Sequence, residues 1–222
     1  MLAVRHRDDS MPQLSPLAGL LVRRESDPAL MAALQGRSEE DMTNRFAAGH
    51  RAYVAYLGGE ATAFGWVATR VATIGELYAT FEIPEGERYL WNFVTLRAHR
   101  GKGIYPRLVD AIVRAESCEA HRFWIAYAPE NHASGAGIRK AGFVTVAELS
   151  FDSSGRPAVA GTPSEDGVAA ASVFGLPQAT EALSQCWRCA RAALGTVAHG
   201  ETSCSGSSCA CDYQRPEIAC AA

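Results

Sequence analysis

The residues best suited to chemistry in this sequence form a turn, His99 to Pro106, which reads His-Arg-Gly-Lys-Gly-Ile-Tyr-Pro. The β-rich run Tyr89 to Leu96 precedes this turn, and the amphipathic segment Arg107 to Glu116 follows it. Glycines let the backbone approach a large anion closely, and the N–H groups of a helix N-terminus point at that anion. A strand, a glycine turn and a helix N-terminus therefore predict a pyrophosphate-binding site.

The glycine turn lacks the spacing of two familiar phosphate-binding loops. Lys102 is not followed by Ser or Thr, so the turn is not a Walker-type loop. No third glycine stands where the dinucleotide-binding fingerprint requires it. Taken alone, the turn is equally compatible with a plain loop connection.

A second segment, Pro129 to Phe143, makes the pattern more specific. It reads Pro-Glu-Asn-His-Ala-Ser-Gly-Ala-Gly-Ile-Arg-Lys-Ala-Gly-Phe. Together the two segments resemble the GNAT superfamily of acyl-CoA-dependent N-acyltransferases. The acyl-CoA motif of that family, Arg/Gln-x-x-Gly-x-Gly/Ala, is matched by Arg100 and Gly103 and imperfectly by Tyr105. Its later motif, an Asn that opens a helix ending in Lys-x-Gly-Phe, is matched from Asn131 to Phe143.

The resemblance implies an α/β (α+β) fold with a mixed central sheet and helices on both faces. In that fold two parallel strands splay apart and hold the pantetheine arm of CoA between them. We expect four parts of the chain: an N-terminal arm at residues 1–18, the GNAT-like domain at 19–152, a linker at 153–177 and a cysteine-rich C-terminal extension at 178–222.

The resemblance also assigns the contacts with acyl-CoA. The backbone of one strand end would bind the acyl group and pantetheine, through Phe93, Val94, Thr95 and Leu96. The N–H groups of the turn would hold the pyrophosphate, at Gly101, Lys102, Gly103, Ile104 and Tyr105, with added charge from Arg100 and Lys102. Asn131 and Ser134 would face the pantetheine arm. The alternative is that Asn131 only caps its helix and that Ser134 is a solvated surface residue.

Two departures from the family pattern concern the chemistry. Tyr105 stands where the family prefers Gly or Ala, which leaves its N–H available and its ring free to pack outward. Ile138 stands where many members carry a tyrosine that protonates the leaving thiolate. Tyr127 is a candidate replacement acid, or a half-buried strand-end tyrosine. Glu87 is the first candidate for the general base. Glu82 and Glu76 come next, and each of the three is also compatible with an ordinary solvated carboxylate.

The expected elements follow from apolar periodicity and turn residues. Strands are expected at 20–24, 51–57, 60–69, 89–96, 122–127, 143–151 and 158–160, helices at 28–34, 39–47, 107–116, 132–141 and 178–194, and a strand or lid at 74–83. The dipeptide Gly58-Gly59 predicts a hairpin.

Composition narrows the class of protein. A chain of 222 residues with 48% hydrophobic content can bury a full core, and a net charge of −3 argues against a general nucleic-acid binder. No apolar run approaches the roughly 20 residues that span a bilayer. The short run Leu17 to Val22 is followed at once by charged residues, unlike a secretory signal. We therefore expect a cytoplasmic protein without a membrane or nucleic-acid partner, for which a homodimer is one allowed assembly.

Seven cysteines are unevenly distributed. Cys118 is expected to be a buried small hydrophobe in the helix after the glycine turn. The other six lie beyond residue 185, and Cys186, Cys189, Cys209 and Cys211 are candidate ligands for zinc. Their spacing matches no recognised zinc finger. A reactive thiol or disulfide switch, and a tail with no role in catalysis, are the alternatives.

The resemblance to the GNAT superfamily implies an N-acyltransferase, most simply an N-acetyltransferase. Acetyl-CoA or another acyl-CoA would donate its acyl group to the primary amine of a small molecule or peptide, by direct attack in a ternary complex. Two other classes stay open: a non-catalytic acyl-CoA-binding protein, and a metal- or thiol-responsive protein that uses the GNAT-like domain as a scaffold.

Overall fold

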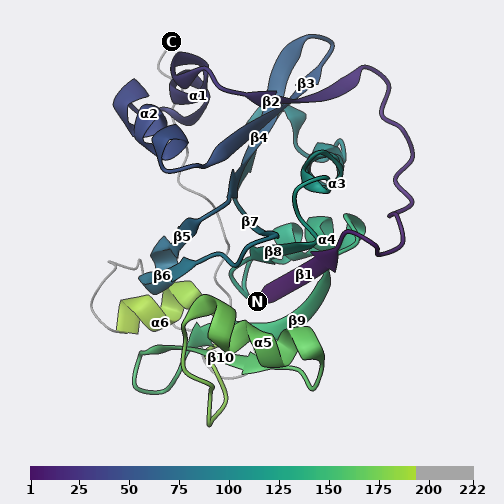
Figure 1. The fold of residues 1–222 in the computed structure, drawn as a ribbon. Coiled ribbons are helices and arrows are strands. Elements are labelled where there is room, and N and C mark those ends of the chain that lie inside the picture. The colour runs from purple at the N-terminus through teal and green to yellow at the C-terminus, as the bar shows by residue number, and fades with distance from the viewer. Residues whose placement is uncertain (194–222) are drawn as a thin grey trace.

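The computed structural model describes residues 1–193 and contains one eight-stranded sheet in the order β10-β9-β1-β8-β7-β4-β3-β2 (Figure 1). Its strands are β1 (Leu2–His6), β2 (Leu20–Glu25), β3 (Arg51–Leu57), β4 (Glu60–Ala68), β7 (Glu87–Thr95), β8 (Arg122–Ala126), β9 (Val144–Phe151) and β10 (Pro157–Gly161). In this sheet β7 and β8 are parallel, and every other neighbouring pair is antiparallel. The expected mixed sheet is confirmed.

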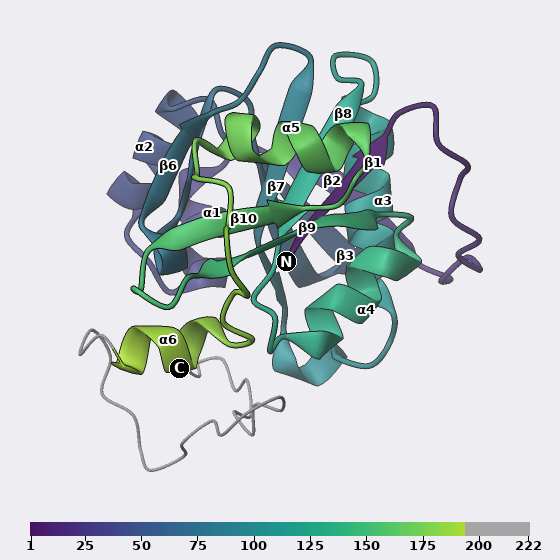
Figure 2. The same cartoon turned by 90° about the horizontal axis from the view of Figure 1, so that it is seen from below.

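Helices cover both faces of the sheet, as Figure 2 shows from below. One face carries α3 (Ile104–Glu116) and α4 (His132–Lys140), and the other carries α1 (Pro28–Gln35), α2 (Glu39–Ala47) and α5 (Glu165–Phe174). The short α6 (Trp187–Ala193) contacts β9. A separate hairpin of β5 (Val71–Ile74) and β6 (Ala79–Glu82) packs against α5.

The alternation of side chains along the strands builds these layers. In β8, Phe123 and Ile125 are buried beneath α3, and Trp124 between them packs against Phe174 of α5 on the other face. The apolar stripe of α3 lies on the same side as Phe123. Both faces of the central strands are therefore buried, which fixes the register of the strands that carry the candidate site.

Local sequence explains several element boundaries. The Asp27 side chain accepts hydrogen bonds from the first-turn N–H groups of α1, and Pro28 occupies the first helical turn. Gly58 and Gly59 have φ values of 63° and 89° in the β3–β4 turn. That left-handed conformation is the one which two-residue hairpins require, so the hairpin prediction is confirmed.

The expectation of an N-terminal arm is wrong for Leu2–His6, which form β1 in the middle of the sheet. The charged residues that suggested an arm have partners. Arg5 is 1% exposed, and its guanidinium lies 2.9 Å from Asp110 of α3. His6 Nε2 lies 2.9 Å from Asp166 of α5. Because these charged residues are paired with acidic residues in the fold, the charged sequence of β1 does not look like that of a buried strand.

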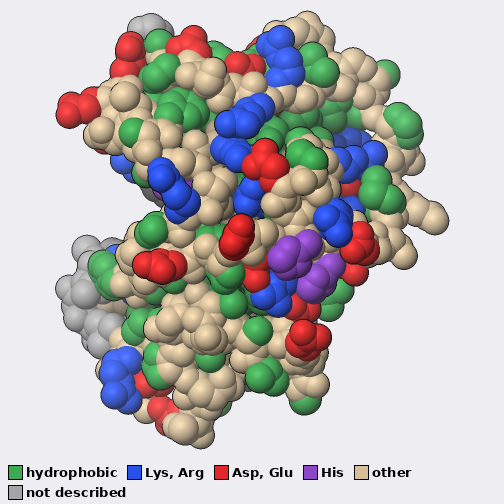
Figure 3. Space-filling view, viewed as in Figure 1, with side chains coloured by type: hydrophobic (Ala, Val, Ile, Leu, Met, Phe, Trp, Pro, Cys, Tyr) green, Lys and Arg blue, Asp and Glu red, His purple; other side chains and the backbone are tan. Residues whose placement is uncertain are grey.

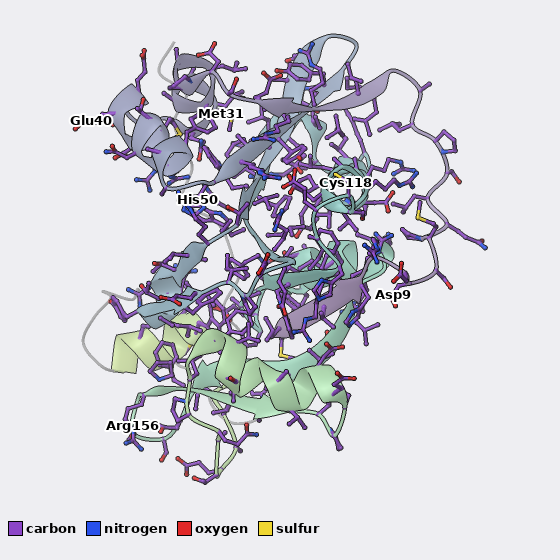
Figure 4. The ribbon with its side chains drawn as sticks, viewed as in Figure 1. Asp9, Met31, Glu40, His50, Cys118 and Arg156 are labelled. Carbon is purple, nitrogen blue, oxygen red and sulfur yellow. The ribbon has the colours of Figure 1, made fainter. Side chains whose placement is uncertain are left out.

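The expected linker at 153–177 is also wrong, because α5 lies inside it. Ser164 caps the helix, two acidic residues follow, and Gly175 ends it in the left-handed conformation. These residues are typical of helix ends, although the many small residues of this segment suggested a linker. The expected helix at 178–194 begins only at Trp187 within the described residues. Cys118 lies beyond the end of α3 and is exposed, so the prediction of a buried thiol is wrong (Figure 4).

Candidate functional site

Strands β7 and β8 stop pairing half-way along β7. Glu87 to Leu90 pair with Arg122 to Ile125, and β7 then continues to Thr95 without β8. The other edge of β7 stays paired with β4 as far as Thr95. Among the described residues, the backbone from Trp91 to Thr95 therefore has no strand partner on its β8 side. We call this stretch the splayed edge.

A β-bulge marks the start of the splayed edge. The β4–β7 register shifts between Phe64 and Trp66, and Asn92 has a φ of 49°. A non-glycine residue in this region is uncommon and costs conformational energy. The Asn92 side chain donates to Gln35 Oε1 at 2.9 Å, which helps to hold the bulge. Bulges re-aim a strand, so the backbone at this position turns away from the regular ladder.

The glycine turn lies directly after the splayed edge. Gly101 and Gly103 have φ values of 78° and 69°, and Gly103 is the N-cap residue of α3. No side chain of the described residues caps this helix, so its first turn is open to an external anion. Pro106 removes one N–H there. Arg100 Nε donates to Thr95 O at 3.2 Å, which fastens the turn to the splayed edge.

Tyr105 points inward rather than outward. Its ring contacts Phe93 edge-on with centroids 5.5 Å apart, and its hydroxyl lies 3.2 Å from Ser134 Oγ on α4. A Cβ on Gly137 would come within 2.4 Å of the ring, so this glycine gives the tyrosine its space. The ring thus spans from α3 to α4 beside the splayed edge. The expectation of an outward ring is wrong, because α4 offers a glycine surface that accepts it.

Helix α4 presents the second motif as the sequence implied. Asn131 is its N-cap residue and accepts a hydrogen bond from Ser134 N at 3.1 Å. Ser134 faces Tyr105, while Ile138 is 1% exposed and belongs to the core beneath α3. The position that often carries the acid in the family therefore holds a buried aliphatic side chain here.

The structure does not bring Glu87 to the splayed edge. Glu87 begins β7, five residues before Asn92, which is about 16 Å along an extended strand. Its carboxylate is buried, accepts from Trp124 Nε1 at 2.5 Å and pairs with Arg122. These contacts tie β7 to β8 at the paired end. With these contacts the Glu87 carboxylate stabilises the fold, and it is not placed to take a proton from an incoming amine.

Tyr127 follows β8 and packs over α4. Its hydroxyl lies 3.3 Å from Thr145 Oγ1, and a Cβ on Gly135 would meet its ring at 2.7 Å. The two glycines of α4 thus each accept one tyrosine ring, Gly135 that of Tyr127 and Gly137 that of Tyr105. Tyr127 stays a candidate acid.

A polar group around Gln35, which no sequence motif indicated, lies on the face of β7 that is covered by α1 and α2. Gln35, which is 4% exposed, accepts from Asn92 Nδ2, from Arg45 Nη1 at 3.1 Å and from Trp66 Nε1 at 3.3 Å. This one amide oxygen connects α1, α2, β4 and the bulge of β7. The only hint in the sequence is a glutamine on the apolar face of a short helix.

Of the four candidate zinc ligands, Cys209 and Cys211 lie outside the described residues. Cys186 is buried and Cys189 is half-buried at the start of α6. Within residues 1–193, no cluster of three or more His, Cys, Asp or Glu side chains could hold a metal ion. The same part of the chain has no helix long and apolar enough to cross a membrane.

Two parallel strands that splay apart, followed by a helix N-terminus without a side-chain cap, define a mixed α/β protein. The family model described as Acetyltransferase (GNAT) family matches residues 21–143. The chain belongs to this family, and the resemblance read from its two motifs is confirmed.

Solved structures with a similar fold include three acetyltransferases. A GNAT-family acetyltransferase from Streptococcus pneumoniae is 15% identical, with a TM-score of 0.44 over 60% of this chain and 92% of that one. A GNAT-family acetyltransferase from Elizabethkingia anophelis with acetyl-CoA bound is 10% identical, with a TM-score of 0.46 over 62% and 83%. An aminoglycoside 6′-N-acetyltransferase from Acinetobacter haemolyticus is 21% identical, with a TM-score of 0.42 over 60% and 97%. The comparison with curated proteins gave no match.

Proposed function

We propose that the protein transfers an acyl group, most simply acetyl, from acyl-CoA to a primary amine by direct attack within a ternary complex. One observation carries this proposal: the splayed edge, the glycine turn and the open N-terminus of α3 follow one another along a single segment, Trp91 to Tyr105. Membership of the acetyltransferase family supports it.

In this proposal each part of the segment binds one part of acyl-CoA. The N–H groups of Gly101 to Tyr105 bind the diphosphate, with Arg100 and Lys102 adding charge. The backbone of Phe93, Val94, Thr95 and Leu96 pairs with the acyl and pantetheine amides, as an added strand would. Asn131 and Ser134 face the arm from α4. A solved relative with acetyl-CoA bound is consistent with this choice of cosubstrate.

The chemistry needs a neutral amine and an acceptable leaving group. The ammonium group gives one proton to a base, the neutral nitrogen attacks the thioester carbonyl, and the C–S bond breaks to release CoA thiolate. The nitrogen loses a second proton to become the neutral amide, and that proton can pass to the thiolate. A thiol pKa near 8.5 lets the sulfur leave as a thiolate without a strong acid. The hydroxyls of Tyr105 and Tyr127 are the candidate proton donors on the α4 side. Glu82 and Glu76, on and beside the β5–β6 hairpin, stay candidates for the base.

A non-catalytic acyl-CoA-binding protein is the second candidate function. The buried Ile138 favours it, because that position supplies no proton to the thiolate. Release of free thiol from acetyl-CoA in the presence of an amine panel separates the two. Calorimetric CoA binding with no thiol release above the rate without amine would favour the second candidate. The absence of CoA binding would contradict both.

A further inference from the structure

A hollow opens on the face of the sheet opposite α3 and α4. Figure 3 shows it between the lobe of α1 and α2 and the region of β5, β6 and α6, with Lys and Arg side chains on its upper margin. His50 is labelled in Figure 4 between α2 and β5, at this hollow. Trp91, the first residue of the splayed edge, contacts His50 with ring centroids 5.1 Å apart. The hollow therefore reaches the strand that would hold the acyl group.

The C-terminal turn of α2 brings Arg45 and His50 together. His50 N donates to Arg45 O at 3.0 Å, and Gly49 between them has a φ of 88°. A Cβ on Gly49 would lie 2.8 Å from Arg70 Nε, so the glycine also admits a second cation beside the turn. The Arg70 side chain donates to Ala47 O at 3.1 Å. Three basic side chains thus gather where helix α2 passes into β3.

Arg45 has an unusual set of partners for a half-buried cation. Its guanidinium lies over the rings of Trp66 and Trp91, 5.3 and 4.9 Å from their centroids, and it donates to the neutral Gln35 amide. Among the described residues no carboxylate forms an ion pair with it; the nearby Asp41 pairs with Arg37 at 3.7 Å. Burying a charge without a counter-charge is costly, and such groups concentrate at binding sites.

Two further polar atoms beside Arg45 form no hydrogen bond with any part of residues 1–193. Trp91 Nε1 and His50 Nδ1 are buried, and neither forms a hydrogen bond within the described chain. Each can donate a hydrogen bond, the indole always and the imidazole in one tautomer. Buried donors without acceptors are rare in folded proteins and call for an explanation. A bound anion would supply both the counter-charge for Arg45 and the acceptors for these two atoms.

We propose that Arg45, Trp91 and His50 bind an anionic group, a carboxylate or phosphate, carried by the acceptor amine. This inference rests on the proposed transfer to an amine. The anionic group would occupy the α2 side of the hollow and leave the amine to reach the acyl group at the splayed edge. Glu76 and Glu82 lie on the β5–β6 hairpin, and in this proposal their carboxylates would attract an ammonium group to that side of the hollow before it loses its proton. A polycationic acceptor would meet Arg45 and Arg70 and is disfavoured.

The first experiment measures discrimination between matched acceptors. Amines that carry a carboxylate, a phosphonate or a neutral carboxamide at the same position are compared by kcat/KM, with spermidine as the polycation. We expect the better anionic member to exceed its carboxamide by about 10- to 100-fold, the range for a charge-assisted hydrogen bond. Arg45→Gln should reduce this ratio to near 1. The carboxylate and phosphonate members show which anion fits the site.

The matched control is Arg23→Gln. Arg23 also lies over a tyrosine ring, 4.5 Å from the Tyr56 centroid, but it has a carboxylate partner in Glu25 and stands on the edge strand β2. The discrimination ratio should be unchanged in this variant. A preference for the carboxamide or for spermidine, or an equal ratio in Arg45→Gln and the wild type, would overturn the inference while leaving acyl transfer intact.

A second measurement does not depend on turnover. Succinate, which has no amine, is titrated into the CoA-bound protein while the His50 ring signals are followed by NMR, assigned with a His50→Gln variant. Binding should shift these signals and raise the pKa of His50, and Arg45→Gln should abolish both changes. Unshifted signals would contradict an anion site even if no acceptor amine were found. If succinate shifts the His50 signals as expected but the protein transfers no acyl group to any amine, the result would instead count against the proposed function.

Discussion

From the inward position of the Tyr105 ring we predict how much the ring weakens CoA binding. The ring touches Phe93 on the splayed edge and Ser134 on α4, where the pantetheine arm would pass in the proposed complex. CoA binding should therefore require the ring to move. Tyr105→Ala removes the ring and also restores the residue type that the family motif prefers.

The size of the effect follows from the contacts that the ring must give up. The edge-on pair with Phe93 contributes about 1 kcal/mol, and the hydroxyl–hydroxyl bond to Ser134 contributes about 1 kcal/mol. Losing both on binding weakens CoA by about 2 kcal/mol, or roughly 30-fold in Kd. Tyr105→Ala should strengthen CoA binding by up to that factor, measured by titration calorimetry.

Two variants of α4 provide an independent test. Gly137→Ala places a Cβ 2.4 Å from the Tyr105 ring and should displace it, so that CoA binds more tightly. Gly135→Ala is the matched control, because its Cβ meets Tyr127 at 2.7 Å and leaves Tyr105 in place. Both gain similar helix propensity, about 1 kcal/mol. An unchanged or weaker CoA affinity in Tyr105→Ala would refute the idea that the ring stands in the path of the cosubstrate.

Three further predictions concern stability and pH. Glu87→Gln should lower the free energy of unfolding by about 2–4 kcal/mol in urea titrations, because it breaks the buried pair with Arg122. It should leave kcat within about twofold, because Glu87 lies far from the splayed edge. A large fall in kcat with normal stability would instead support Glu87 as the general base. Glu116→Ala should cost about 3–5 kcal/mol, because Glu116 pairs with the buried Arg88 at 2.9 Å; a loss below 1 kcal/mol would show that the pair is dispensable. Burial, and then Arg45, lower the pKa of His50 below its ordinary 6.5. As the pH falls through 6.5 the unfolded chain takes up this proton first, so stability should decline there, and His50→Gln should flatten that part of the curve; an identical slope would contradict the assignment.

Much of the fold could be read from the sequence because its signals are local. Asp27-Pro28 at the start of α1 and Gly58-Gly59 between β3 and β4 act within a few residues, and the structure confirms both. Strand β1 could not be read in the same way. Its charged residues are buried only because Asp110 and Asp166, more than a hundred residues away, come to meet them.

The candidate site likewise has parts that follow from local sequence and parts that depend on long-range contacts. The glycine turn and the Asn131 helix start are continuous in sequence, so their roles could be proposed before the fold was known. The Gln35–Arg45–Asn92 group could not, because its members come from α1, α2 and β7 and meet only in the folded protein. The distance of Glu87 from the splayed edge could not be read from the sequence either. The sequence places Glu87 just ahead of a strand, but only the fold shows that β7 and β8 stay paired from Glu87 to Leu90.

The most direct test of the account is a crystal structure of the protein with CoA bound. We predict that the diphosphate lies within hydrogen-bond distance of the backbone N–H groups of Gly101 to Tyr105, with pantetheine along Phe93 to Leu96 and the Tyr105 ring displaced from Ser134. A CoA molecule bound elsewhere, with those N–H groups satisfied by the protein's own atoms, would contradict the account.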